Sequence, residues 1–306
     1  MAKETSTSIL VSISCITYNH APYIRQCLDG FLMQQTEFAF EVLIHDDCST
    51  DGTTEIIKEY EAKYPDIIKP IYEDENQYQQ GKPAGSAVWN FPRAKGKYIA
   101  MCEGDDYWVD PLKLQKQVDF MEANPDYSLC GTNGLVKYEG IKKDDKLFNN
   151  LIVSRELLPQ DIIGHWIFPT ASLLFKKDVC MDYPKWTEKV YSGDQVLMLL
   201  SLNMGRVYAF SDVSCVYRRD VASKSSLSMT IRRTKSRAYV ITQNIILYEQ
   251  FYKYTGRKYE KHIIPLLNDL HQREKAYKMM DRSVLLAALR YPLAFLRILR
   301  LRKNNK

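Results

Sequence analysis

Residues 9–45 read ILVSISCITYNHAPYIRQCLDGFLMQQTEFAFEVLIH, and this stretch indicates how the chain begins to fold. Its first eight residues are small or apolar and rich in β-branched types, which is typical of a buried strand. A helix is expected from about Pro22, because proline is favoured near a helix start and apolar residues then recur at helical spacing. Residues 41–45 are a second short strand. The stretch therefore predicts a strand–helix–strand unit.

The same alternation continues along the first half of the chain. A helix carrying Ile56 and Tyr60 on one face is expected next, followed by strands at residues 67–72 and 97–102. Asp110-Pro111 is expected to open a further helix as N-cap and first position. Alternating strands and helices predict an α/β fold with a mostly parallel sheet flanked by helices.

The second half is less regular and then becomes helical. We expect a strand at residues 171–175 and a helix at 192–204 that ends at Gly205. Beyond residue 225 the spacing is helical, with helices at 239–252 and 257–280. The chain is therefore predicted to form an α/β domain over residues 1–225 and a C-terminal helical extension over 226–306.

Composition and charge place the chain among ordinary globular proteins. Of its 306 residues, 45% are hydrophobic and 26% charged, and the net charge is only +5. From Arg282 to the C-terminus there are seven Lys or Arg and no acid. This local excess favours an anionic partner surface over general nucleic-acid binding. Residues 283–301 combine leucines with arginines, so they predict either an interfacial membrane helix or a helix docked on the first domain.

The cysteines and the N-terminus indicate a reducing compartment. The seven cysteines are odd in number and none forms a CxxC pair, so a disulfide framework is not expected. The first residues have no secretory pattern, and no run of 18 apolar residues spans a bilayer. We expect a cytoplasmic protein, with the C-terminal tail as a possible peripheral contact at the inner face of the cell membrane.

Three polar clusters follow predicted strands: Thr17-Tyr18-Asn19, Asp46-Asp47, and Glu103-Gly104-Asp105-Asp106. In parallel α/β sheets ligands bind at the carboxyl ends of the strands, so we expect these clusters to converge there.

Each cluster also has a structural interpretation. Asp105-Asp106 can hold a divalent cation against a diphosphate, or can simply form a solvated turn. Asp47 can accept hydrogen bonds from a base or ribose, whereas Asp51 is expected to cap the next helix. Tyr18-Asn19 can contact a base, or can form a turn before Pro22.

Taken together, three motifs resemble glycosyltransferase family 2. They are residues 11–23 with Tyr18-Asn19, DDCSTDGT at 46–53, and EGDDYWVDPLKL at 103–114. The likeness extends over residues 8–220. It implies a GT-A, Rossmann-like fold and an inverting enzyme that transfers a sugar from a nucleotide-sugar, expected to be UDP-linked. The acceptor would be a hydroxyl of a glycan or lipid-linked saccharide in bacterial surface polysaccharide synthesis, with Mn²⁺ or Mg²⁺ as cofactor.

The resemblance also assigns roles to residues. The nucleotide-sugar site falls on Thr17, Tyr18, Asn19, Asp47 and Asp105, the metal ligand on Asp106, and the catalytic base on Asp194. Many relatives have Asp where this chain has Glu103, and close relatives often have His where it has Asp220, two residues after the matching Tyr217-Arg218 pair. The region that builds acceptor sites in relatives contains Trp166, Thr170, Ser172 and Trp186.

Three alternatives remain open at this point. Asp194 can be a purely structural acid in a first helical turn, because Ser192 and Gln195 have the spacing of a capping box. The chain can be a non-catalytic nucleotide-sugar-binding protein on the same scaffold, although a binder does not need the base. A nucleotidyltransferase is less favoured, since the loop at residues 18–22 has neither glycine nor a basic pair.

Overall fold

The computed structural model describes residues 8–82, 85–181, 183–190, 192–220 and 237–290. The chain forms two compact units, Met1–Thr230 and Ile231–Lys306.

The first unit is an α/β structure. Its strands are β1 (Ile9–Thr17), β2 (Ala39–Asp46), β3 (Ile68–Tyr72), β4 (Tyr98–Met101), β5 (Tyr107–Trp108), β6 (Tyr127–Glu139), β7 (Lys146–Leu147), β8 (Arg155–Leu157), β9 (Leu174–Lys176) and β10 (Arg206–Asp220). Its α-helices are α1 (Ala21–Leu32), α2 (Thr53–Lys63), α3 (Ser86–Trp89), α4 (Lys113–Ala123), α5 (Pro159–Ile162) and α6 (Gly193–Met204). Short 3₁₀ turns are η1 (Phe91–Arg93), η2 (Thr170–Ser172), η3 (Lys177–Cys180) and η4 (Lys185–Lys189).

The strands form one sheet in the order β3-β2-β1-β4-β9-β6-β10-β5, with β7 beside β6 and β8 beside β10. The pairs β1–β2, β2–β3, β1–β4 and β6–β10 are parallel, and these are the longest ladders among the described strands. β9 lies antiparallel between β4 and β6 and so joins the two parallel halves. The prediction of an α/β fold with flanking helices is confirmed, and the sheet is mixed.

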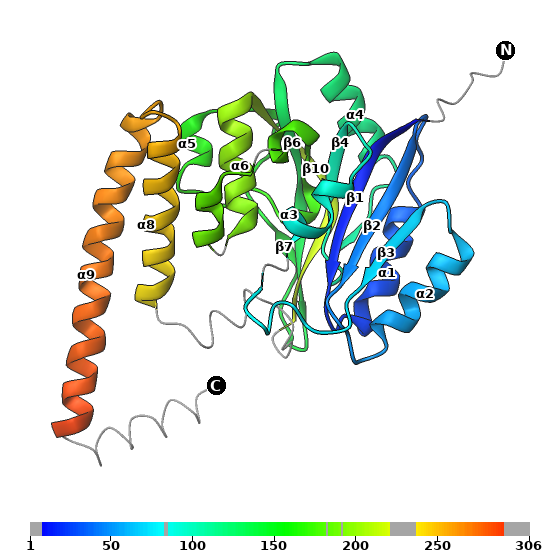
Figure 1. The fold of residues 1–306 in the computed structure, drawn as a ribbon. Helices are drawn as coiled ribbons and strands as arrows, with labels where there is room; N and C mark the ends of the chain where they lie inside the picture. Colours follow the sequence, from blue (N-terminus) through cyan, green and yellow to red (C-terminus); the bar gives the residue numbers. More distant parts are fainter. Residues whose placement is uncertain (1–7, 83–84, 182, 191, 221–236, 291–306) are drawn as a thin grey trace. The chain divides into compact units, whose positions relative to one another are not determined.

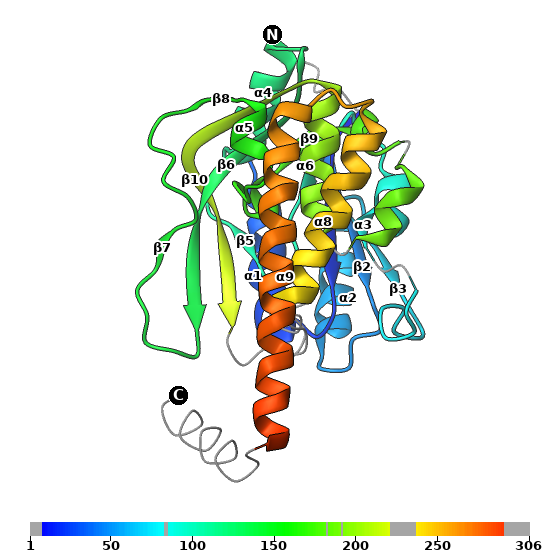
Figure 2. The same ribbon diagram turned by 90° about the vertical axis from the view of Figure 1, so that its left-hand side faces the viewer.

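Helices cover both faces of this sheet (Figures 1 and 2). Alternation along β1 explains the two faces. Val11, Ile13 and Cys15 are fully buried in the core that contains α1, α2 and α4. Ser12 and Ser14 point to the other face, where Ser14 Oγ donates to Ser86 Oγ of α3 at 2.9 Å.

Two elements of the first unit begin about three residues later than predicted. The helix expected to open at Asp110-Pro111 begins at Lys113, because Asp110 Oδ1 accepts the N–H of Leu112 at 2.9 Å and closes a turn ahead of it. The strand expected over residues 171–175 is divided, since residues 170–172 form η2 and β9 begins at Leu174. Both differences arise from local turns that hydrophobic spacing does not reveal.

The second unit contains two helices joined by a short turn, α8 (Arg237–Tyr254) and α9 (Glu260–Arg290). The rings of Phe251 and Tyr259 stack with centroids 5.6 Å apart across the turn. No helix in the described residues is long and apolar enough to cross a membrane. The predicted basic tail lies largely outside the described part, which ends at Arg290 and describes no side chain from residue 280 onward.

Candidate active site

Register alone brings the three predicted polar clusters together. Thr17, the last residue of β1, lies opposite Asp46, the last residue of β2. The N–H of Asp47 donates to Thr17 O at 3.1 Å, and the N–H of Gly104 donates to Ile16 O at 3.0 Å. The predicted convergence at the carboxyl edge of β1, β2 and β4 is therefore confirmed.

Several polar residues of the first two clusters hold the loops to one another. Asn19 adopts a left-handed backbone conformation with φ of 54°, and its Oδ1 accepts the N–H of Thr50 at 2.8 Å. Asp51 accepts the N–H of Thr53 at 3.1 Å and that of Ala21 at 3.0 Å. These are the first N–H groups of α2 and α1, so Asp51 satisfies one helix-start donor in each, although the N-cap residue of α2 is Gly52 and not Asp51.

The predicted base-binding residues Tyr18 and Asp47 both contact the loop that follows β3. Asp47 is 6% exposed, and its two carboxylate oxygens accept the N–H groups of Gln77 at 2.7 Å and Tyr78 at 3.2 Å. Tyr18 Oη accepts from Gln79 Nε2 at 3.1 Å. A carboxylate has about four acceptor positions, so Asp47 keeps capacity for a further donor such as a base N–H.

Glu103, Asp105 and Asp106 form an acidic triad after β4. One ligand oxygen from each lies within 4.8 Å of the others. Asp106 is 1% exposed; its Oδ1 accepts the N–H of Arg218 at 2.8 Å, but its Oδ2 has no hydrogen-bond partner in the described residues. A buried carboxylate oxygen without a donor is costly unless a cation occupies that position. The triad therefore fits a hard divalent cation, for which carboxylate oxygens are the usual protein ligands.

The pKa values of the triad agree with this interpretation. Burial, Asp105 and Asp194 raise the pKa of Glu103 to about 8, in that order of importance. Burial, Asp105 and Glu103 raise the pKa of Asp106 well above its usual range. Burial and neighbouring acids thus disfavour the charged forms of Glu103 and Asp106, although Arg218 partly offsets the effect at Asp106. A bound divalent cation would reverse that effect.

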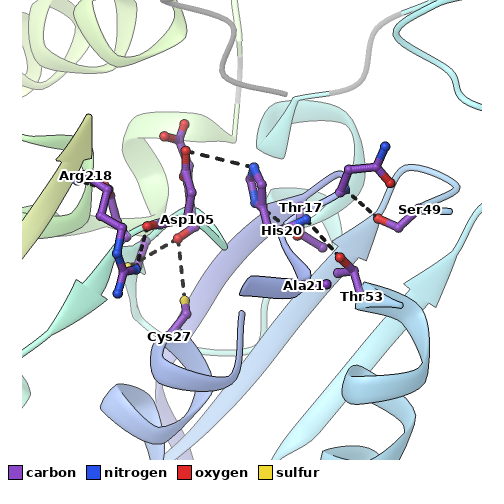
Figure 3. Close-up of polar contacts among 12 residues, drawn as sticks. Thr17, His20, Ala21, Cys27, Ser49, Thr53, Asp105 and Arg218 are labelled. Atoms are coloured by element: carbon purple, nitrogen blue, oxygen red, sulfur yellow. Dashed lines mark hydrogen bonds and ion pairs between the residues drawn. The ribbon is translucent and has the colours of Figure 1, made fainter. Parts of the chain in front are cut away.

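His20, which sequence analysis missed, supports the triad from the β1 side. His20 is buried, and its Nδ1 lies 3.1 Å from Thr17 Oγ1 while its Nε2 lies 3.9 Å from Asp105 Oδ2 (Figure 3). Gly104 packs against the same pair: a Cβ there would lie 2.7 Å from Thr17 Oγ1 and 3.0 Å from His20 Nδ1. Only a residue without a side chain fits. The signal in the sequence was a histidine immediately after Tyr18-Asn19.

Arg218 supports the triad from the β10 side. Its Nη1 donates to Asp105 O at 2.8 Å, and its side chain is buried (Figure 3). Arg218 of the matching Tyr217-Arg218 pair therefore lies at the acidic loop. Asp220 is the last residue of β10, and its side chain lies outside the described part.

Asp194 lies in the first turn of α6, as predicted. Its Oδ1 accepts from Ser192 Oγ at 2.6 Å and from the N–H of Gln195 at 2.8 Å. The predicted capping box is absent at this helix start, because Ser192 bonds to the Asp194 carboxylate instead of capping a backbone N–H. Asp194 is close enough to the triad to raise the pKa of Glu103.

The four predicted acceptor residues differ in accessibility. Trp166 is 39% exposed, and its ring meets those of Phe148 and Tyr217 edge to face. Trp186 lies half-buried in η4. Thr170 is 8% exposed and Ser172 is fully buried. Of these four residues, the two tryptophans therefore have the more accessible side chains.

Sequence comparison identifies relatives of this chain. Residues 12–183 match the profile of the family described as Glycosyl transferase family 2. An uncharacterised protein of Mycobacterium tuberculosis is 37% identical over 211 residues, which are 68% of this chain and 58% of that protein. The chain thus spans a little over half the length of that relative. Escherichia coli UDP-Glc:alpha-D-GlcNAc-diphosphoundecaprenol beta-1,3-glucosyltransferase WfaP is 38% identical over 114 residues, covering 37% of this chain and 42% of its own.

Solved structures share the fold at low sequence identity. Staphylococcus aureus TarS (residues 1–349) in complex with UDP-GlcNAc has a TM-score of 0.64 at 17% identity, covering 94% of this chain and 79% of its own. The mannosyltransferase PcManGT of Pyrobaculum calidifontis, in complex with GDP-Man and Mn²⁺, has a TM-score of 0.56 at 18% identity, covering 99% and 82%. These likenesses confirm the GT-A architecture.

Proposed function

This chain belongs to glycosyl transferase family 2, and from that premise we propose that it is an inverting, metal-dependent enzyme that transfers a sugar from a UDP-sugar to a hydroxyl acceptor. The observation that carries the proposal is the position of Asp194 beside an acidic triad whose buried Asp106 Oδ2 lacks a hydrogen-bond donor among the described residues. The Asp194 carboxylate is suited to proton transfer, and the acidic triad is suited to holding a cation.

The metal site falls on Asp106, with Asp105 and Glu103 as the other carboxylates of the triad. Mn²⁺ or Mg²⁺ bound there would neutralise the charge that develops on the departing diphosphate. The donor complex of PcManGT with Mn²⁺ supports this assignment. Glu103 has the same carboxylate chemistry as the Asp of many relatives, and its oxygen lies with the other two, so the substitution preserves the site.

Asp194 is the proposed general base. Ser192 Oγ and the N–H of Gln195 both donate to its Oδ1, which fixes the carboxylate and leaves Oδ2 for an acceptor hydroxyl. Asp194 would remove the hydroxyl proton as that oxygen attacks the anomeric carbon from the face opposite the diphosphate. A single displacement inverts the configuration at that carbon.

The donor pocket falls on Thr17, Tyr18, Asn19 and Asp47, with Asp105 toward the ribose or sugar. Asp47 would accept a base N–H with its remaining lone pairs, which suits uracil. The UDP-GlcNAc complex of TarS and the UDP-Glc donor in the name of the E. coli relative support a UDP-sugar. Asn19 acts through the backbone of Thr50, so its contribution is to shape the pocket.

A glycan or a lipid-linked saccharide is the proposed acceptor, in bacterial surface polysaccharide synthesis at the cytoplasmic side of the membrane. The diphosphoundecaprenol acceptor in the name of the E. coli relative supports the lipid-linked form. Trp166 and Trp186 are the proposed acceptor contacts, because aromatic faces stack on sugar rings. The basic segment at residues 283–301 would bring the chain to an anionic bilayer.

Thermal unfolding with a panel of nucleotide-sugars, each with and without Mn²⁺, tests this proposal. A UDP-sugar at about 100 times its Kd should stabilise the chain by about 2.7 kcal/mol, and only when Mn²⁺ is present. Release of UDP on adding an acceptor, with a product of inverted configuration by NMR, separates an enzyme from a non-catalytic binder. Stabilisation that is insensitive to EDTA would contradict the metal assignment.

A further inference from the structure

Arg218 is an unusual charged residue, because its side chain is buried at the end of a strand. It is 6% exposed. The guanidinium carbon lies 4.8 Å from the ring centroid of Tyr23 on α1 and 4.3 Å from that of Tyr107 on β5. A planar guanidinium can stack on aromatic rings while its edge makes hydrogen bonds, and a lysine ammonium cannot do both.

All three side-chain nitrogens of Arg218 meet protein groups. Nη1 donates to Asp105 O at 2.8 Å, Nη2 donates to Gln26 Oε1, and Nε lies 3.4 Å from Glu139 Oε1. The backbone N–H of the same residue donates to Asp106 Oδ1 at 2.8 Å. One residue of β10 therefore contacts both aspartates of the acidic loop, Asp105 through its side chain and Asp106 through its backbone N–H. Residues of α1 and β6 hold that side chain in place.

We infer that Arg218 is a positioning residue for the proposed cation site: it holds the Asp105-Asp106 segment in the geometry that binds the metal. This inference rests on the proposed function. Nη1 and Nη2 donate to Asp105 O and Gln26 Oε1, so both terminal nitrogens of the guanidinium meet protein acceptors, while Nε makes an ion pair with Glu139 but no hydrogen bond among the described residues. The effect of Arg218 on a ligand passes through the acidic loop.

The sign of the effect on metal binding separates this role from two others. A positive charge near a cation repels it, so if Arg218 only balanced charge, removing it would tighten Mn²⁺ binding. If Arg218 instead bound the donor's phosphates, its removal would weaken UDP binding and leave the binding of Mn²⁺ alone unchanged. A positioning residue predicts that Mn²⁺ binding weakens even without nucleotide.

The experiment measures free Mn²⁺ by electron paramagnetic resonance during titration of the full chain, first without and then with UDP. Arg218→Met should weaken the binding of Mn²⁺ alone by about 10–100-fold, the usual cost of losing a group that orients metal ligands. Arg218→Lys should fail to restore it, because the ammonium keeps the charge but not the fork. The matched control is Arg219→Met, because Arg219 has no contact with the triad among the described interactions. Its guanidinium carbon lies 5.6 Å from the ring centroid of Tyr217.

Unchanged or tighter Mn²⁺ binding by Arg218→Met, or full recovery by Arg218→Lys, would overturn the inference. If Arg218→Met does not fold by circular dichroism, Gln26→Ala replaces it. Gln26 is exposed on α1, and its loss frees Nη2 without opening the core, so Mn²⁺ binding should again weaken; unchanged binding would overturn the inference. Asp106→Ala distinguishes failure of the inference about Arg218 from failure of the proposed function. If the unaltered chain binds Mn²⁺ no better than Asp106→Ala does, the proposed metal site itself is wrong.

Discussion

Replacing Gly104 by alanine should damage the acidic loop at its tightest point. The loop N–H of Gly104 is bonded to Ile16 O on β1, so the residue cannot move away freely. An added Cβ would lie 2.7 Å from Thr17 Oγ1, 2.9 Å from Thr17 Cβ and 3.0 Å from His20 Nδ1. Cβ atoms in proteins essentially never approach other atoms that closely, so the loop, the Thr17–His20 pair or both must shift.

The magnitude follows from this overpacking. Inserting a methyl group into a well-packed site costs about 1–3 kcal/mol. For a unit of this size each kcal/mol lowers Tm by about 2–4 °C, so Gly104→Ala should melt about 2–12 °C below the unaltered chain. Gly104 does not have a positive φ, so the cost comes from contact and not from backbone strain. The same shift moves Asp105 and Asp106, and Mn²⁺-dependent transfer should fall with it.

Gly85→Ala is the matched control. A Cβ at Gly85 meets no atom within 4 Å, and its φ of −88° suits any residue. Differential scanning calorimetry of the two variants, together with UDP-sugar turnover, measures both effects. The reasoning fails if Gly104→Ala has the same Tm as Gly85→Ala and keeps normal Mn²⁺-dependent turnover. The close approach of this loop to Thr17 and His20 would then have no energetic importance.

Three further predictions concern the base, the metal and the tail. Asp194→Asn should lower transfer by about 10²–10⁴-fold while calorimetric UDP-sugar affinity is retained, and normal turnover would make Asp194 only a helix-start acid. Asp106→Ala should abolish Mn²⁺-dependent stabilisation by UDP and lower the metal-free Tm only modestly, since it removes a buried oxygen without a donor together with the acceptor of the Arg218 N–H; continued turnover in EDTA by the unaltered chain would refute the metal role. Deleting residues 283–306 should leave a folded enzyme that no longer sediments with anionic liposomes, whereas aggregation would show that the tail is part of the core.

The convergence of the three polar clusters was predictable because it depends only on strand order and direction. Parallel neighbours end at the same edge, so residues that follow β1, β2 and β4 must meet there. The register of Thr17 with Asp46 is the direct expression of this rule. Hydrophobic spacing was enough to locate these strands, because each is short, buried and followed by polar residues.

Contacts between distant segments were not predictable. Arg218 and Asp105 are separated by 113 positions, and no periodicity in a single sequence indicates that they meet. The antiparallel insertion of β9 between β4 and β6 was missed for the same reason. The capping box at Ser192 is absent for a local reason: the Ser192 hydroxyl is turned to donate to the Asp194 carboxylate, and its oxygen accepts no backbone N–H of the helix start.

The hydrogen bonds of the polar side chains distinguish residues that shape the site from residues that bind a ligand, a distinction that the sequence alone does not provide. Asn19 and Asp51 have polar side chains whose acceptors are met by backbone N–H groups of neighbouring loops. Asp106 has one oxygen met by the N–H of Arg218 and one that meets no donor among the described residues. A polar side chain whose hydrogen bonds are all made within the protein helps to shape the site. A buried acid with an oxygen that accepts no hydrogen bond needs a partner from outside the protein. Among the acids of the three motifs, Asp106 is therefore the residue at which the cation is most firmly expected.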